Sequence, residues 1–338
     1  MPELAAKTRL SEDLVLARPI VEGHPNVWIA YDEKLRTDVV VKLLPDELMT
    51  SPEARVRFSR EVRAGSKIES EHVVKRLGSS VTEDGVPFVA LELLVGEDLR
   101  TNLGRHGPMA PSEVVAIVRQ VSTALTAVHG AGIVHRDIKP ENVFLCMQQG
   151  EPSKSPLVKI LDFGVAKSVR AKTSVATSAG IVVGTPMYMS PEQMAGGVID
   201  GQVDLWALSV VAWEALSGHR PFPGEDLQTI GRAALTGPRP RMSAIEPSFR
   251  ALDSFFERAF AVERAGRFTD AAELAEAFAR GVATLSDPQV PSAKSARTRS
   301  IDEFAIAVQR RRRIPWMVLA VVVLLAAVAT VGAIWLQQ

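Results

Sequence analysis

The hydrophobic pattern of this chain changes its period near Ser112, and that change limits the folds open to it. Before this point, residues 14–95 contain short apolar and β-branched runs such as Val39–Leu44, which are typical of strands. Asp84 and Gly85 separate two of these runs and predict a hairpin. From Ser112 onward apolar residues recur every three or four positions, which predicts helices. Strands followed by helices in this way predict an α+β fold with two lobes.

Two more regions have helical signals. Ser51 and Pro52 predict the start of a helix that runs to about Ile68 and interrupts the strand-rich part. Residues 200–282 repeat apolar side chains at the helical period. Five large aromatic residues are expected to pack in the core of this second region: Trp206, Trp213, Phe255, Phe256 and Phe260.

Composition excludes several classes of protein. Cys146 is the single cysteine, so the chain has neither a disulfide framework nor a multi-cysteine metal site. The six histidines lack the spacing of a zinc hydrolase. The 39 basic and 39 acidic side chains balance, so no overall positive field attracts nucleic acid. We therefore expect no nucleic-acid partner.

The last part of the chain has the composition of a membrane anchor. Residues 314–336 hold no charged side chain and are longer than the ~20 residues that span a bilayer as a helix. Arg310–Arg313 precede them, which predicts that the N-terminal side is cytoplasmic. The alternative, a buried core helix, is usually shorter. We expect a single-pass protein of the cell membrane, with a transmembrane helix at 314–336 and a linker with a basic collar at 283–313.

Three polar motifs in the middle of the chain carry the strongest functional signal. His135–Asn142 reads His-Arg-Asp-Ile-Lys-Pro-Glu-Asn, Asp162–Gly164 reads Asp-Phe-Gly, and Gly184–Glu192 reads Gly-Thr-Pro-Met-Tyr-Met-Ser-Pro-Glu. In this order and spacing they resemble the motifs of the bacterial serine/threonine protein kinases of the eukaryotic-like, or Hanks, type. The resemblance covers about residues 14–279.

This resemblance implies both a fold and an activity. The fold is a two-lobed protein-kinase-like domain at residues 14–282, with a β-rich N-lobe at 14–94 and a helical C-lobe at 95–282. The activity is transfer of the γ-phosphate of ATP to a serine or threonine of protein substrates. The cofactors that it implies are ATP and Mg²⁺ or Mn²⁺.

The residue types of these motifs fit phosphoryl transfer. That reaction needs a carboxylate to orient the acceptor hydroxyl and a divalent metal against the phosphate charge. The resemblance assigns Asp137 as this carboxylate and Lys139 as the side chain that reaches the transferring phosphate. Asn142 and Asp162 offer the oxygen ligands that Mg²⁺ prefers.

Lys42 and Glu61 are expected to form an ion pair beside the ATP phosphates. Glu61 lies on the apolar stripe of the helix predicted from Ser51, where an unpaired carboxylate is costly. In the kinase family that this chain resembles, a lysine on a strand pairs with the glutamate at the position of Glu61 and contacts the ATP phosphates. Lys42 ends an apolar strand and fits that lysine.

The resemblance also places the adenine pocket. Phe88–Leu94 is similar to the hinge between the lobes, with Leu91 at the back of the pocket, the backbone of Glu92 and Leu94 bonding adenine, and Asp98 near the ribose. A plain buried strand is the alternative for the start of this run. The other residues that the resemblance places against the nucleotide are Val21, Gly23, Val27, Val40 and Phe144.

The glycine-rich loop departs from the family pattern GxGxxGxV. Val21 stands at the first glycine, only Gly23 matches, and Asn26 or a deletion takes the third. Glycine lets the backbone approach a phosphate closely, which a valine and Pro25 do not. A pseudokinase scaffold with impaired nucleotide binding is therefore the alternative to an active kinase. A small-molecule kinase of the same fold is a third, and Gly184–Glu192 argues against it because it resembles the peptide-binding segment of protein kinases.

The resemblance implies regulation by phosphorylation. Arg136 is expected to receive a phosphate on the activation segment, with Lys159 assisting. Thr177 or Ser178 is the expected site of autophosphorylation. Tethering to a membrane favours transfer in trans between two copies, as in a homodimer, because it raises their effective concentration.

Three further positions resemble structural residues of the family. Glu192 at the end of the activation segment is expected to pair with Arg267. Asp204 is expected to brace the backbone of the catalytic loop. These residues are expected to support the site without touching the substrate.

Overall fold

The computed structural model describes residues 6–20, 26–44, 68–147, 156–161, 186–224 and 226–285. All of them lie in the first of the two units into which the chain divides, residues 1–288. The helix predicted from Ser51 to about Ile68 lies outside these ranges except for its last residue, and so do residues 314–336 and nearly all of the predicted linker. Among the helices within the described ranges, none is both long enough and apolar enough to cross a bilayer.

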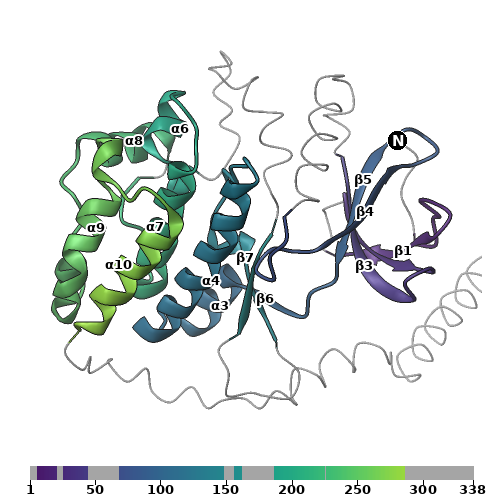
Figure 1. Cartoon of the computed structure of the whole chain (residues 1–338), viewed down its shortest axis with the longest axis horizontal. Helices are drawn as coiled ribbons and strands as arrows, with labels where there is room; N and C mark the ends of the chain where they lie inside the picture. Colours follow the sequence, from purple (N-terminus) through teal and green to yellow (C-terminus); the bar gives the residue numbers. More distant parts are fainter. Residues whose placement is uncertain are drawn as a thin grey trace, which may run out of the picture. The chain divides into compact units, whose positions relative to one another are not determined.

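The first lobe is an antiparallel sheet in the order β1-β2-β3-β5-β4 (Figure 1). Its strands are β1 (Leu14–Pro19), β2 (Val27–Asp32), β3 (Thr37–Leu43), β4 (Arg76–Val81) and β5 (Pro87–Glu92). The hairpin predicted at Asp84 and Gly85 joins β4 to β5. Gly85 has a φ of 80°, in the region that favours glycine, and Thr82 N–H donates to the Val86 carbonyl at 2.9 Å.

Alternation along β3 gives this sheet two different faces. Val39, Val41 and Leu43 are buried in the apolar core of the lobe. Val40 and Lys42 point to the opposite face and are half-buried. The strand therefore stabilises the lobe with one face and leaves the other for the residues expected to contact the nucleotide.

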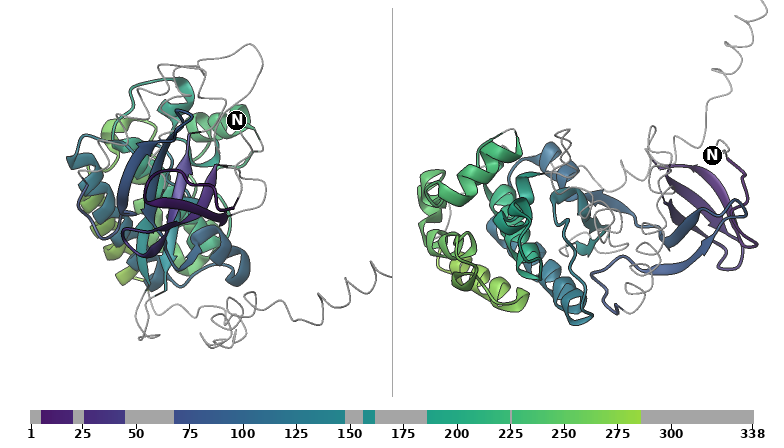
Figure 2. Two further views of the ribbon diagram at one scale, coloured as in Figure 1. Left: turned by 90° about the vertical axis from the view of Figure 1, so that its right-hand side faces the viewer. Right: turned by 90° about the horizontal axis from the view of Figure 1, so that it is seen from above.

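The second lobe is mainly helical (Figures 1 and 2). Its α-helices are α3 (Leu99–His106), α4 (Pro111–Gly130), α6 (Pro191–Ala195), α7 (Gln202–Ser217), α8 (Leu227–Thr236), α9 (Asp253–Ala259) and α10 (Ala271–Ala283). Short 3-10 turns lie at η1 (Pro140–Asn142), η2 (Pro186–Tyr188), η3 (Met242–Ala244), η4 (Pro247–Leu252) and η5 (Arg264–Gly266). The helix predicted from Ser112 is confirmed as α4.

Helix α7 is the centre of this lobe. Every residue from Val203 to Leu216 is buried, and a helix that is apolar on all sides is expected only inside a core. The predicted aromatic anchors pack around it, with the rings of Trp206 and Phe260 5.2 Å apart and those of Trp213 and Phe256 4.9 Å apart. The polar side chains within this buried stretch therefore need partners inside the protein.

A small sheet of β6 (Gly96–Asp98), β7 (Val143–Cys146) and β8 (Leu157–Ile160) carries the functional loops. Strand β7 follows directly after Asn142, and β8 ends two residues before Asp162. The two strands pair antiparallel with Val143 opposite Ile160, so the residue after Asn142 lies beside the last residue of β8. Val74 N–H donates to the Ile160 carbonyl at 3.1 Å, which ties the end of β8 to the chain that enters β4.

The predicted pair of Glu192 and Arg267 is confirmed as a buried ion pair. Nη1 of Arg267 donates to both carboxylate oxygens of Glu192, at 2.8 and 3.1 Å. Nε of Arg267 donates to the Ala261 carbonyl at 2.8 Å, and its guanidinium lies 4.8 Å from the ring centre of Trp206. The pair therefore fixes the start of α6 against α7 and the segment before η5.

Replacing Arg267 with Met should lower the free energy of unfolding by about 3–5 kcal/mol, because it leaves the Glu192 carboxylate buried without a cation. Urea denaturation of the full chain measures this loss. Arg119→Met is the matched control, since Arg119 forms an exposed pair with Glu276 and should cost less than about 1 kcal/mol. Equal losses in the two variants would contradict the structural role of the buried pair.

Candidate active site

The candidate active site is built on the loop that connects α4 to β7. The amide Nδ2 of Asn142 donates to the backbone oxygen of Asp137 at 2.7 Å and to its Oδ2 at 3.1 Å. Nζ of Lys139 lies 3.6 Å from the same Oδ2. Three of the four side chains predicted for catalysis thus meet within one loop, and Asp162 lies outside the described residues.

Asn142 holds this loop against the end of β8. It is buried, it closes the turn η1, and its backbone oxygen accepts a hydrogen bond from Leu161 N–H at 2.9 Å. Leu161 is the residue directly before Asp162. The bond therefore places Leu161, the last described residue before the Asp-Phe-Gly motif, beside the catalytic loop.

His135 makes a second link between the same two segments, and its partners define its protonation. Nε2 contacts the Leu161 carbonyl at 2.8 Å, and because a carbonyl only accepts, Nε2 carries a hydrogen. Nδ1 lies 3.3 Å from Asp137 N–H, which only donates, so Nδ1 is the unprotonated nitrogen. The buried imidazole is thus neutral and bridges the residue before Asp162 to Asp137.

Asp204 braces the catalytic loop, as predicted. Its Oδ2 accepts from His135 N–H at 2.8 Å and its Oδ1 from Arg136 N–H at 2.7 Å. A third donor, Nε2 of His129, reaches Oδ2 at 2.8 Å. Arg136 has a φ of 64°, a left-handed conformation that costs a non-glycine residue about 1–3 kcal/mol. The hydrogen bond from Arg136 N–H to Asp204 stabilises this conformation next to Asp137.

The first lobe gathers the predicted nucleotide residues on one face of its sheet. Lys42 lies opposite Val27 on β2 and Val89 on β5. In the next row, Val40 lies opposite Leu91 on β5. Residues paired in this way point to the same side, so Val27, Val40, Lys42 and Leu91 share one face. Val21, Gly23 and Glu61 lie outside the described residues.

After the predicted hinge, Phe88–Leu94, the chain enters the second lobe at β6. Phe144 on β7 lies opposite Asp98 in the β6–β7 ladder. The Asp98 carboxylate caps α3, accepting from Thr101 N–H at 2.9 Å and from the Thr101 hydroxyl at 2.8 Å. Its contact with a ribose, like the adenine contacts of Glu92 and Leu94, stays a prediction.

Lys159 forms an ion pair with Glu92, a residue predicted for the hinge, and its expected assistance to Arg136 stays a prediction. Its Nζ lies 2.6 Å from Oε1 of Glu92, and the same oxygen accepts from Lys75 N–H at 2.7 Å. Lys159 is buried on β8, where it needs a nearby carboxylate, and Glu92 supplies it. The pair joins the end of β5 to β8.

The donor set beside Asp137 suits a hard cation. The amide nitrogen of Asn142 makes both bonds to Asp137, so its amide oxygen is the atom left for a cation. Oxygen donors of this kind fit Mg²⁺. The described residues contain no cluster of three or more histidine, cysteine or acidic side chains that forms a metal site by itself. The second predicted ligand, Asp162, falls outside them.

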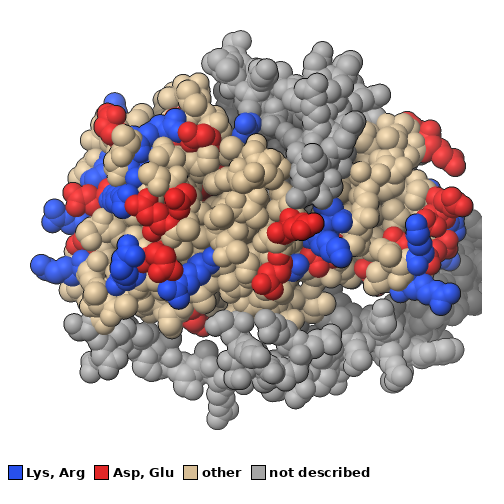
Figure 3. Space-filling view, in the orientation of Figure 1, with Lys and Arg blue, Asp and Glu red and all other residues tan. Residues whose placement is uncertain are grey.

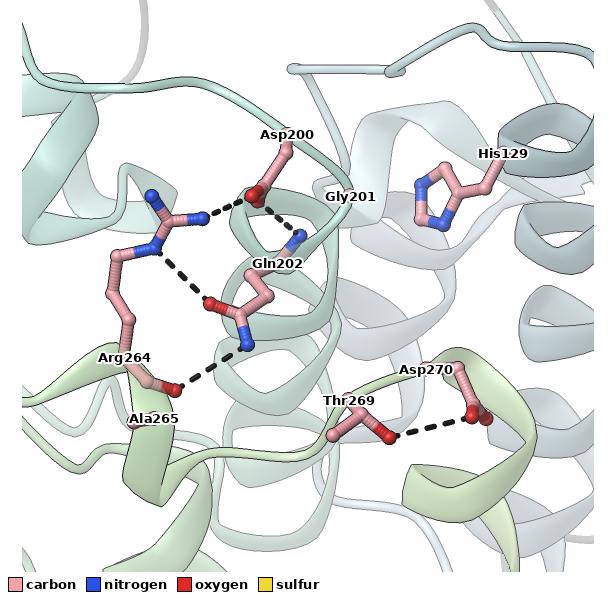
Figure 4. A pocket seen from close by; sticks show the side chains of 8 residues that line it. All are labelled: His129, Asp200, Gly201, Gln202, Arg264, Ala265, Thr269 and Asp270. Carbon is pink, nitrogen blue, oxygen red and sulfur yellow. Dashed lines mark hydrogen bonds and ion pairs between the residues drawn. The ribbon is translucent and has the colours of Figure 1, made fainter.

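The described surface also shows its distribution of charge and one pocket away from the catalytic loop residues. Basic and acidic side chains are interspersed over the described part of the face in Figure 3. A pocket of about 610 Å³ lies at the start of α7 and is lined by eight residues: His129, Asp200, Gly201, Gln202, Arg264, Ala265, Thr269 and Asp270 (Figure 4). No residue predicted to bind nucleotide or act in catalysis is among them. His129 links this pocket to the catalytic loop through its bond to Asp204.

Sequence reasoning missed one group of residues near the loop. Arg100 on α3 contacts Glu141 in the catalytic loop, Tyr188 in η2 and Glu214 on α7. These four residues are far apart in sequence, and the pattern of Arg100 is that of an ordinary surface residue of a helix. Only the motif positions of Glu141 and Tyr188 gave a signal, and it did not point to Arg100.

A strand-rich lobe, a helical lobe and an Asp-Lys-Asn loop braced by a buried aspartate define a phosphotransferase. The Protein kinase domain family matches residues 24–278, and the chain belongs to this family. Its domain is that of a bacterial serine/threonine protein kinase of the Hanks type, a transferase.

Known relatives agree with this assignment. The serine/threonine-protein kinase pkn3 of Myxococcus xanthus is 36% identical over 68% of this chain and 42% of its own length. PknL of Mycobacterium tuberculosis is 35% identical over 85% of this chain and 70% of its own length. A crystal structure of the PknI kinase domain from the same organism has a TM-score of 0.65 at 25% identity and covers 83% of this chain and 99% of that one. The chain spans less than half the length of pkn3 and of Pkn1, another relative from Myxococcus xanthus.

Replacing Asp204 with Asn should slow phosphate transfer by about 10- to 100-fold. The new amide nitrogen cannot accept, so one of the three donors loses its partner at a cost of about 1–3 kcal/mol, and 1.4 kcal/mol is tenfold in rate. Steady-state kinetics on the full chain should show a fall in kcat with little change in KM for ATP. Asp200→Asn, in the loop just before α7, is the control and should keep kcat. An unchanged kcat in Asp204→Asn would show that the loop does not depend on this brace.

Proposed function

We propose that this chain is an active, membrane-anchored serine/threonine kinase that phosphorylates protein substrates in the cytoplasm. The observation that carries the proposal is the assembly of Asp137, Lys139 and Asn142 within one braced loop. A scaffold that had lost catalysis would be free to lose this geometry. Here the neutral His135 and Asp204 both maintain it.

The proposed roles follow from the chemistry of each group. Asp137 orients the acceptor hydroxyl and accepts its proton, and Lys139 contacts the transferring phosphate. Asn142 and Asp162 hold Mg²⁺ or Mn²⁺, which neutralises charge on the phosphates of ATP. Lys42, paired with Glu61, positions those phosphates from the first lobe.

The remaining nucleotide contacts are proposed for both sides of the adenine. Val27 and Val40 cover it from the sheet, Leu91 closes the back of the pocket and Phe144 lies below. Backbone groups of Glu92 and Leu94 bond its edge, and Asp98 approaches the ribose. Val21 and Gly23 complete the loop over the phosphates, where the missing glycines weaken binding without removing the ionic contacts.

Anchoring and regulation complete the proposal. Residues 314–336 span the cell membrane once, and the basic collar Arg310–Arg313 keeps the kinase domain on the cytoplasmic side. Two copies held in one membrane phosphorylate each other at Thr177 or Ser178. The phosphate then binds Arg136, which the structure holds next to Asp137, and orders the segment.

Purified full-length chain in detergent, given labelled ATP, Mg²⁺ and a generic protein acceptor, should incorporate phosphate on serine or threonine. Asp137→Asn should lower incorporation by at least 10²-fold, because the acceptor hydroxyl loses its carboxylate. Mass spectrometry of the chain itself should find phosphate at Thr177 or Ser178. Incorporation that survives in Asp137→Asn would mean a contaminating kinase.

A measurement of ATP binding separates a scaffold that still binds nucleotide from a chain whose nucleotide site is closed. If the wild-type chain transfers nothing, ATP affinity is measured on the same sample. Binding without transfer would favour the pseudokinase scaffold, and no binding would mean that the substitutions at Val21 and Asn26 have closed the site. In the mass spectrometry of the chain itself, phosphate found only outside residues 162–185 would contradict the proposed regulation at Thr177 or Ser178.

The full chain should remain with membranes after washing at high salt and high pH and should be released only by detergent. A chain that ends at residue 309 should be found in the soluble fraction, since both the collar and the apolar segment are removed. Immunoblotting of the fractions measures this. Release of the full chain by salt alone would replace a transmembrane anchor with a peripheral, charge-dependent attachment.

A further inference from the structure

Arg100 is the centre of a polar network that the proposed reaction does not use. Its guanidinium donates to both carboxylate oxygens of Glu214, Nη1 to Oε1 at 2.9 Å and Nη2 to Oε2 at 3.2 Å. Nε donates to Oε1 of Glu141 at 3.1 Å, and Nη2 also donates to the Tyr188 hydroxyl. That hydroxyl in turn donates to Oε2 of Glu214 at 2.5 Å. One arginine thus fills the space between two carboxylates.

The network joins the catalytic loop to the expected peptide-binding segment. Glu141 is next to Asn142, whose amide holds the Asp137 carboxylate. Tyr188 lies in Gly184–Glu192, and Gln193 just beyond it donates to the Arg136 carbonyl at 3.4 Å. In the proposed function a peptide brings its hydroxyl to Asp137, in the same loop as Glu141, which Arg100 joins to Glu214.

Burial raises the energetic cost of leaving a charge in this network without a partner. The Glu214 side chain is 6% exposed, whereas Arg100 and Glu141 reach the surface at 35% and 41%. Burial opposes the charge of Arg100, but its interactions with Glu214, Tyr188 and Glu141 together outweigh this and raise the pKa of the guanidinium. Burial, followed by the bond to Glu214, raises the pKa of Tyr188, which stays a neutral donor. Arg220 approaches Glu214 at 3.7 Å, so the two carboxylates face two cations.

Removing Arg100 would change the chemistry of this place. Glu141 and Glu214 would remain together beside the catalytic loop with Arg220, 3.7 Å from Glu214, as the neighbouring cation that is left. Two carboxylates, one of them buried, would then face one cation, which favours binding of a second cation or a proton. Since Arg100 and Glu141 are partly exposed, a side chain of a bound peptide has access to the same position. A substrate lysine or arginine is the cation that such a site selects.

We propose that Arg100 occupies from within the chain the position that a basic substrate residue would otherwise take between Glu141 and Glu214. This inference rests on the proposed function, because it names the substrate class of that site. The kinase then accepts serine and threonine peptides without selecting for a basic residue near the acceptor. Arg100 is a residue that determines specificity by filling an acidic subsite.

The test is a scan of acceptor peptides in which a single arginine moves through each position from four before to four after the serine. Steady-state kcat/KM on the full chain measures transfer, and fluorescence anisotropy with alanine in place of the serine measures binding. For wild type, the kcat/KM values and the affinities of all peptides should agree within about threefold. Arg100→Met should prefer an arginine at one position by about tenfold or more, in both measurements.

Two variants serve as controls on α3. Arg100→Lys keeps a cation in place and should stay unselective, and Arg105→Met, which removes an exposed pair with Glu97, should match wild type. A wild-type chain that prefers arginine at any position by tenfold would overturn the proposal, and this arm needs no folded variant. So would a folded Arg100→Met, with a thermal transition as cooperative as wild type, that shows no preference in binding. Absence of transfer by wild type together with the binding preference in Arg100→Met would count against the kinase activity and not against this inference.

Discussion

The catalytic loop depends on one buried carboxylate, that of Asp204. An ionised carboxylate inside a core is stable only when donors surround it, and Asp204 is fully buried. Its three donors are two backbone N–H groups of the catalytic loop and the His129 imidazole. The cost of burying the charge is thus offset only when the loop has the conformation that presents Asp137. The same hydrogen bonds to Asp204 therefore stabilise the core and fix the geometry of the site.

Helix α7 has a second arrangement of this kind about 15 Å further along its axis, because Glu214 lies ten residues after Asp204 and each residue of a helix adds 1.5 Å. Glu214 is the second buried carboxylate of the helix, and it organises Arg100, Tyr188 and Arg220. An apolar helix therefore holds both the catalytic loop and, through Tyr188, the end of the activation segment. Both attachments are electrostatic, so each is directional and each fixes a position, which apolar packing alone does less well.

Much of the fold and part of the site were predictable from the sequence because they rest on local or motif signals. The apolar and β-branched run Val39–Leu44 predicted β3, and the helical period from Ser112 predicted α4. The pairs of Glu192 with Arg267 and of Asp204 with the loop backbone followed from resemblance and are confirmed. The ion pair of Lys159 with Glu92 joins β8 to the end of β5 and was not predicted. A register between distant strands has no local sequence signal.

The sequence by itself determined the order of elements, the residue types of the catalytic loop and the charge-free segment near the end. Periodicity and motif spacing are properties of neighbouring residues, so the sequence alone displays them. Only the tertiary structure decided the tautomer of His135, the left-handed conformation of Arg136 and the site of Arg100. Each of these depends on donors and acceptors that lie about 25 to 115 positions away along the chain. Burial brings such groups together, and the requirement that a buried charge or polar atom be paired then fixes where they lie.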